Sequence, residues 1–253
     1  MTIESSGARA APEPAAKHSL EDSSREILLA AADPGISEDL ALALLKRPDL
    51  APEVIEQLSK SSRLKKSRKV KLAVVSHPKT PRHVSLPMIR HLFTFDLMQV
   101  ALTPVVPAHL KLAADDALVS RLETISIGEK LSLARRASGR VAAALLLDPE
   151  ARVRKAALDN SRLNESSIVK AIMSPVAPGS FIDAVCRHPK WCLRHEVKVA
   201  LLRNEKTPPA LALELARGFP PGQLHALLEA SRLPAATKSH LRQALEKQTG
   251  KGE

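Results

Sequence analysis

The stretch DPEARVRKAALDNSRLNESSIV, residues 148–169, holds one complete transition between two helices. An apolar helix with arginines in its first turns runs into a short polar link, and a second apolar helix follows a capping residue. The same order recurs in LLKRPDLAPEVIEQL (44–58), VVSHPKTPRHVSLPMI (74–89), ALTPVVPAHLKL (101–112), LLRNEKTPPALALEL (201–215) and EASRLPAATKSHLRQAL (229–245). Pro81 and Pro107 are 26 residues apart, and so are Pro208 and Pro234. Such a period is typical of stacked supersecondary units.

Residues in the links predict where the second helices start. Thr80 and Thr207 each precede a proline, so we expect the threonine to act as N-cap and the proline to occupy the first helical position. Ser126 and Glu129 have the spacing of a capping box, which predicts a helix start near Ile127.

The composition favours helices over strands. Of the 253 residues 44% are hydrophobic, only 2% are aromatic and nine are glycine, which suits a helical chain with enough apolar surface for a core. No long uncharged apolar run and no signal-peptide pattern is present, and the two cysteines are too few for a disulfide framework. We therefore expect a cytoplasmic protein that is not bound to a membrane.

The stretch 148–169, together with HPKWCLRHEVKVALLRNEKTPPALALELA (188–216), resembles the leucine-rich repeat variant, a HEAT-like α-solenoid. The resemblance covers roughly residues 35–245 and implies a right-handed solenoid of helix pairs. It also implies an interaction scaffold, because such repeats mainly bind other molecules. A member of that family carries an N-terminal cysteine cluster for an iron–sulfur centre, but no cysteine precedes Cys186 here, so no cofactor is expected.

We accordingly predict an all-α fold, an α-solenoid of about six or seven stacked helical hairpins over residues 25–247. A disordered acidic tail is expected over residues 1–24 and a second disordered tail over 248–253. The net charge is +11, while residues 1–33 carry three positive and six negative side chains. A basic body with an acidic N-terminal segment favours an anionic partner.

The densest positive run is KSSRLKKSRKVK, residues 60–71, which contains no acid. One interpretation is a solvated helix face, and the other is a phosphate-binding patch. The candidate binding residues in this run are Arg63, Lys65, Lys66, Arg68, Lys69 and Lys71. The phenylalanines, Phe93, Phe95, Phe181 and Phe219, lie in apolar contexts and are expected in the core, which argues against stacking of nucleic-acid bases.

A second candidate group is Lys190, Trp191, Arg194 and Lys198. Trp191 is interpreted either as a wedge between repeats or as an anchor for a partner. The neighbouring Cys186, His188, Cys192 and His195 have the residue types of a zinc site or a thiol–imidazole pair. Because their spacing matches no zinc motif, we expect buried cysteines and surface histidines with no metal.

HEAT-like repeats often place an aspartate six residues before an arginine, and Asp148 and Arg154 have this spacing. A structural role is therefore expected for Arg154. The equivalent Lys71 and Lys198 lack the acidic partner, so they are more available to a ligand.

No phosphate loop, nucleophile elbow or paired carboxylate is recognisable, so no catalytic residue is predicted. The sequence favours a non-catalytic scaffold that presents a partly basic solenoid surface to a protein partner with an acidic face. The alternative is binding of duplex nucleic acid or another polyanion through residues 60–71.

Overall fold

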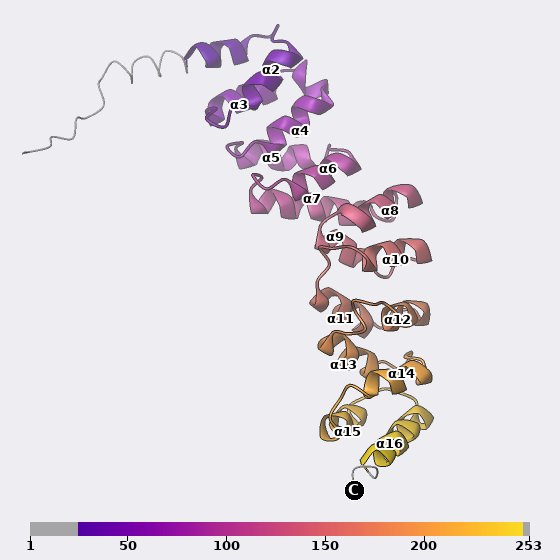
Figure 1. Cartoon of the computed structure of the whole chain (residues 1–253). Helices are drawn as coiled ribbons and strands as arrows, with labels where there is room; N and C mark the ends of the chain where they lie inside the picture. Colours follow the sequence, from indigo (N-terminus) through magenta and orange to yellow (C-terminus); the bar gives the residue numbers. More distant parts are fainter. Residues whose placement is uncertain (1–24, 250–253) are drawn as a thin grey trace, which may run out of the picture. The chain divides into compact units, whose positions relative to one another are not determined.

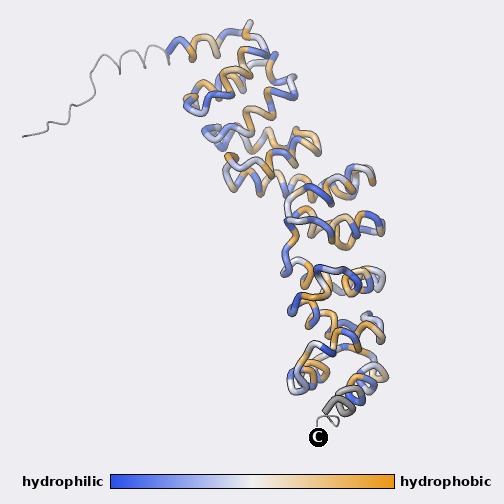
Figure 2. The backbone as a smooth tube through the Cα atoms, viewed as in Figure 1, coloured by the Kyte–Doolittle hydropathy of each residue, from blue (hydrophilic) through white to orange (hydrophobic). Residues whose placement is uncertain are grey.

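The computed structural model describes residues 25–249, with side chains as far as residue 243 (Figure 1). Every regular element in this range is a helix, which confirms the predicted all-α class. The expected tails lie outside the described residues, except that residues 248 and 249 continue the last helix. Figure 2 shows hydrophilic and hydrophobic residues alternating along the helices, as expected where one face of each helix is buried.

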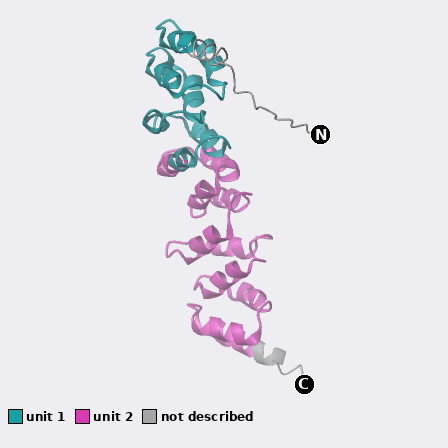
Figure 3. Ribbon diagram, turned by 90° about the vertical axis from the view of Figure 1, so that its left-hand side faces the viewer, with its two compact units in different colours: residues 1–114 teal, residues 115–253 magenta. Residues whose placement is uncertain are grey.

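The chain divides into two compact units, residues 1–114 and residues 115–253 (Figure 3), so the expected repeat region 25–247 has a boundary after residue 114. The described helices of unit 1 are a first one over residues 25–32, α2 (Glu38–Leu45), α3 (Pro52–Lys60), the short 3₁₀ helix η1 (Leu64–Lys66), α4 (Arg68–Ser76), α5 (Arg82–Ile89) and α6 (Thr94–Leu102). The next helix, α7 (Ala108–Arg121), contains the boundary.

In unit 1, helices that alternate in the sequence pack on each other. Helix α2 packs on α4 and α4 on α6, while α3 and α5 each pack on α4. The core between them includes Ile55, Leu58, Leu64 and Val74, all almost fully buried. This is the packing of a solenoid, in which each helix pair contacts its sequence neighbours.

Unit 2 has the same organisation. Its helices are α8 (Ile127–Arg136), α9 (Gly139–Ala144), α10 (Ala151–Leu158), α11 (Glu165–Met173), α12 (Gly179–Cys186), α13 (His195–Arg203), α14 (Pro209–Ala216), α15 (Pro221–Glu229) and α16 (Ala235–Thr249). One layer stacks α8, α10 and α12, and the other stacks α9, α11, α13 and α15; α14 packs on both α13 and α16.

A five-residue joint recurs before the helices. Its fourth residue is buried and donates its backbone N–H to the carbonyl of the first residue, as Thr80 does to His77 and Thr207 to Asn204. The same hydrogen bond closes the joints that begin at residues 33, 47, 103, 160 and 174. Five of the six predicted links, all except the one in residues 229–245, thus contain the same turn.

The prediction that Thr80 and Thr207 act as N-caps is wrong. Helix α5 begins at Arg82 and α14 at Pro209, each one residue later than expected, and a proline stands at the N-cap. The Thr80 hydroxyl instead donates to the Val74 carbonyl, and that of Thr207 to the Leu201 carbonyl. Each threonine therefore stabilises the end of the preceding helix. The capping box predicted at Ser126 is confirmed, and α8 begins at Ile127.

Side chains at the first position of a joint bind the preceding repeat. His77 Nε2 lies 2.9 Å from the Arg47 carbonyl oxygen, and Asn204 Nδ2 donates to the Ile172 carbonyl at 2.7 Å. The buried Asn160 donates to the carbonyls of Ala134 and Ala137. The carbonyls of Ile172 and Ala134 lie in the last turns of α11 and α8, where they have no partner within their own helix.

The two units contain an internal repeat of 127 residues. Helices α4, α5 and α6 begin at residues 68, 82 and 94, and α13, α14 and α15 begin at 195, 209 and 221, so each of the three differences is 127. The joints that begin at 33, 47 and 77 recur at 160, 174 and 204 with the same offset. Both copies also share an irregularity, because a single helix, α2 or α11, lies between two consecutive joints.

Candidate binding surfaces

The basic segment, residues 63–71, consists of η1 and the first turn of α4 with its flanking residues. The side chains of Arg63, Lys65, Lys66 and Lys69 are exposed, and none forms an ion pair within the described part of the chain. The carboxylates that take part in ion pairs of unit 1 are those of Asp49, Glu56 and Asp96. The sequence-predicted cations thus come together on one short surface segment.

Arg68 is the exception in this segment. Its Nε and Nη2 donate to the two carboxylate oxygens of Asp96, both at 2.8 Å, and its guanidinium lies 5.0 Å from the Phe93 ring centroid. Asp96 is buried, so this pair holds α4 against α6. The structural contacts of Arg68 leave it less available to a ligand than its neighbours.

The expectation that all four phenylalanines lie in the core is wrong for two of them. Phe181 and Phe219 are buried, whereas Phe93 is 62% and Phe95 38% exposed. Both exposed rings flank the start of α6, where Asp96 and Leu97 take the inward positions. Unit 1 therefore presents aromatic surface beside its basic segment.

A pocket of about 270 Å³ opens next to the basic segment. It is lined by Ser59, Lys65, Lys71, Met88 and His91. Lys71, which was predicted to be available to a ligand, is half-buried and forms no ion pair in the described range.

In the second candidate group, Trp191 is 2% exposed and donates its indole N–H to the Leu158 carbonyl at 2.8 Å. This placement fits its interpretation as a wedge between repeats. Lys190 covers the ring, with its Nζ 4.1 Å from the centroid. Arg194 is exposed at the N-cap of α13, and Lys198 is half-buried.

The expectation of buried cysteines and surface histidines holds for Cys186 and His195, whereas Cys192 and His188 are half-buried. Burial raises the pKa of the Cys186 thiol to about 12, so at neutral pH its sulfur is protonated and a poor nucleophile. His188 Nε2 lies 3.1 Å from the Asp159 carboxylate, and its Nδ1 accepts the N–H of Lys190. The His195 ring packs against Phe219. No group of three or more potential ligands is placed to hold a metal in the described part of the chain.

The expected structural role of Arg154 agrees with its contacts, but its partner differs from the expected one. Arg154 donates to the backbone carbonyls of Asp148 and Pro149, and to the Ser180 hydroxyl of the next layer. The Asp148 carboxylate instead pairs with Lys130 at 2.9 Å. Arg154 therefore bonds to backbone carbonyls, whereas the sequence pattern predicted a bond to the Asp148 carboxylate.

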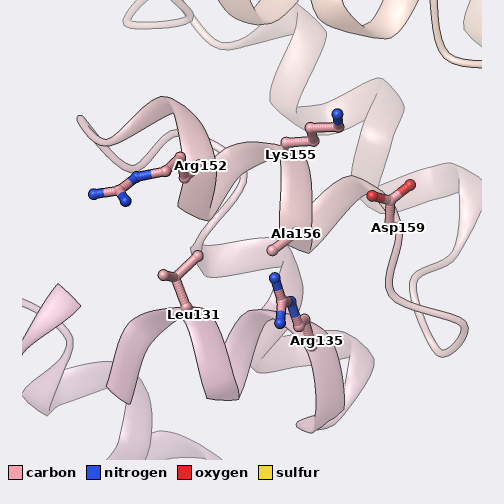
Figure 4. Close-up of a pocket in the computed structure, with 6 residues that line it drawn as sticks. All are labelled: Leu131, Arg135, Arg152, Lys155, Ala156 and Asp159. Atoms are coloured by element: carbon pink, nitrogen blue, oxygen red, sulfur yellow. The ribbon is translucent and has the colours of Figure 1, made fainter. Parts of the chain in front are cut away.

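A groove between α8 and α10, here called the unit 2 groove, was not predicted. It has a volume of about 560 Å³ and is lined by Leu131, Arg135, Arg152, Lys155, Ala156 and Asp159. Figure 4 shows Leu131 and Arg135 rising from α8 toward Ala156 on α10, while the side chains of Arg152 and Lys155 extend outward from α10.

The charges of the unit 2 groove are only partly neutralised. Arg152 pairs with Glu150 at 3.0 Å, and Asp159 is engaged by His188. Arg135 and Lys155 are exposed and have no ion-pair partner among the residues that the structure covers. The clusters SLARR and ARVRK supply these cations, but only the stacking of α8 on α10 brings them together.

Within residues 25–249 no helix combines the length and apolar character needed to cross a membrane. No protein-family model matches the chain, and no curated protein or solved structure matches it. A function can therefore be inferred only from the surfaces described above.

Proposed function

We propose that the protein is a non-catalytic scaffold of the leucine-rich repeat variant or HEAT-like type, and that it binds an acidic segment of a protein partner in the unit 2 groove. The observation that carries the proposal is the combination of an apolar centre, Leu131 and Ala156, with the unpaired cations Arg135 and Lys155. A cytoplasmic location, expected from the two free cysteines, belongs to the same proposal.

The groove suits an acidic peptide better than a duplex. An apolar side chain of the peptide would cover Leu131 and Ala156, while flanking carboxylates would pair with Arg135 and Lys155. A duplex phosphate backbone uses cations but gains little from an apolar centre. The apolar centre therefore selects the acidic segment over the duplex.

The basic segment supports a second candidate function, binding of a nucleic acid or another polyanion. Arg63, Lys65, Lys66 and Lys69 are exposed cations without carboxylate partners among residues 25–243. A polyanion that bound them would lose affinity steeply as the salt concentration rises.

A binding experiment with two probes separates these functions. A fluorescent peptide rich in glutamate and leucine and a fluorescent DNA duplex are titrated with the full chain at ~0.15 M salt. For Arg135→Glu/Lys155→Glu we expect peptide affinity to fall by about 10-fold or more, since roughly 1.4 kcal/mol corresponds to tenfold, and duplex affinity to stay unchanged. Reversal of Arg63, Lys65, Lys66 and Lys69 to Glu should act only on the duplex.

The matched control is Arg203→Glu/Arg217→Glu, which reverses two exposed cations elsewhere in unit 2. If the control weakens peptide binding as much as the groove variant does, net charge alone explains the binding and the groove proposal fails. Absence of peptide binding to the unmodified chain has the same consequence.

A further inference from the structure

The pocket of unit 1 beside the basic segment combines two lysines and a histidine from three elements. Lys65 comes from η1, Lys71 from α4 and His91 from the residues after α5. Met88 adds one apolar wall, and the Ser59 hydroxyl is already engaged with the Glu56 carbonyl. No carboxylate is among the residues that line the pocket.

We propose that this pocket binds a small phosphate monoester. Lys71 is half-buried without an ion-pair partner in the described range, and a partly desolvated cation is stabilised by an anion in contact with it. Two ammonium groups and an imidazole can donate to several oxygens of one phosphoryl group. The volume of about 270 Å³ accommodates a phosphoryl group with a short organic substituent against Met88.

The internal repeat shows that the fold does not require Lys65 or His91. The counterparts of the five pocket residues, 127 positions later, are Cys186, Cys192, Lys198, Leu215 and Gly218. Only the lysine is shared, although α4, α5 and α6 have counterparts of the same length.

In unit 2 the shared lysine, Lys198, lies against Gly218. Its Nζ is 3.3 Å from the position that a Cβ on Gly218 would occupy, so Lys198 fills space that a side chain such as that of His91 would need. Because helices equivalent to α4, α5 and α6 form without a lysine at 192 or a histidine at 218, the packing of these helices does not require Lys65 or His91.

The loss-of-binding test uses the full chain. Binding of glycerol phosphate and of inorganic phosphate is followed by ³¹P NMR titration, and binding of the dicarboxylate succinate is followed by calorimetry. We expect glycerol phosphate to bind more tightly than inorganic phosphate, because of the Met88 wall, and succinate to bind weakly. Lys71→Met should weaken phosphate-monoester binding by about 10-fold or more, and Lys198→Met, the matched control in unit 2, should have no effect.

Exposed Lys65 and His91 provide variants that do not disturb packing, Lys65→Met and His91→Ala, and each should weaken binding. The proposal is overturned if these two variants bind like the unmodified chain, or if Lys198→Met is as damaging as Lys71→Met. This test is independent of the peptide proposal, because the pocket lies in unit 1. The variant that tests peptide binding, Arg135→Glu/Lys155→Glu, changes residues of unit 2 only.

A gain-of-binding experiment uses the internal repeat directly. Cys192→Lys/Gly218→His gives unit 2 the lysine and the histidine of the unit 1 pocket. Gly218 has no positive φ that would resist a side chain, and the flexible end of Lys198, 3.3 Å from the new Cβ, must shift to admit it. The expected result is a rise in stoichiometry from one to two phosphate monoesters per chain. A stoichiometry that stays at one while far-UV circular dichroism is unchanged would contradict the assignment of these residues as the binding set.

Discussion

Trp191 and Leu64 occupy equivalent positions 127 residues apart, and each is almost fully buried. A tryptophan needs a hydrogen-bond acceptor when it is buried, and the Leu158 carbonyl supplies it. Trp191 thus holds the joint after α12 against the end of α10, while Lys190 shields its remaining face. The sequence alone did not decide whether Trp191 is a wedge between repeats or an anchor for a partner, because the neighbouring residues do not reveal whether its side chain is buried.

Replacing Trp191 tests this role. Trp191→Ala should lower the free energy of unfolding by about 3–5 kcal/mol through the cavity it leaves, and Trp191→Phe by a smaller amount, since most packing remains. Urea unfolding followed by circular dichroism measures both. Leu193→Ala, at a side chain that is 71% exposed, should stay within about 0.5 kcal/mol; a Trp191→Ala effect no larger than this would refute the wedge.

At the scale of elements, the joint is the feature that sets where helices end and how they stack. His77 and Asn204, equivalent residues, both reach a carbonyl of the preceding repeat, and so do Lys79 and Lys206 through their Nζ atoms. Gly139 permits a further contact, because a Cβ there would overlap the Arg162 carbonyl oxygen of a joint. The joints are therefore packed interfaces as well as turns.

Asn160 offers a direct measurement of what a joint contributes. It is 1% exposed, donates to two carbonyls of α8 and its C-cap, and accepts the Arg162 N–H. Asn160→Ala should cost roughly 2–3 kcal/mol of unfolding free energy, because buried carbonyls lose their donor. The adjacent exposed Ser161→Ala is the control and should be nearly neutral; equal effects would show that the joint bonds add nothing.

Local patterns were sufficient to predict the helices and the joints, because caps, prolines and apolar spacing act within a few residues. Thr80 and Thr207 were misassigned since a hydroxyl before a proline can either cap the next helix or bond to the previous one. Phe93 and Phe95 were misassigned since both flank a helix start whose inward positions belong to other residues. The unit 2 groove depends on α8 stacking on α10, which no short stretch encodes.

At the scale of the whole molecule, the net charge of +11 is the property that links the candidate surfaces. Exposed cations that have no ion-pair partner repel one another in the folded state. The ion pairs elsewhere on the surface add little stability to offset this repulsion. An anionic ligand would relieve this repulsion at its binding site.

We therefore expect thermal stability to increase with salt. Between low ionic strength and ~0.15 M sodium chloride, where the screening length is about 8 Å, the midpoint of thermal unfolding should rise by a few degrees. The variant with Arg63, Lys65, Lys66 and Lys69 reversed to Glu should show a smaller rise. A midpoint that falls with salt in the unmodified chain would show that its ion pairs outweigh the repulsion.

The 127-residue repeat also bears on how the chain avoids misassembly. Two segments with helices of matching length can exchange partners during folding, a common failure of repeat proteins. Trp191 is too large for the enclosed position of Leu64, and Leu64 cannot donate to a carbonyl as Trp191 does. Because the two copies differ at such positions, a helix of one copy that packed on helices of the other would be overpacked or would leave a buried hydrogen-bonding group without a partner. Each copy is therefore expected to pair with its own helices, which avoids misfolded states in which the two copies exchange helices.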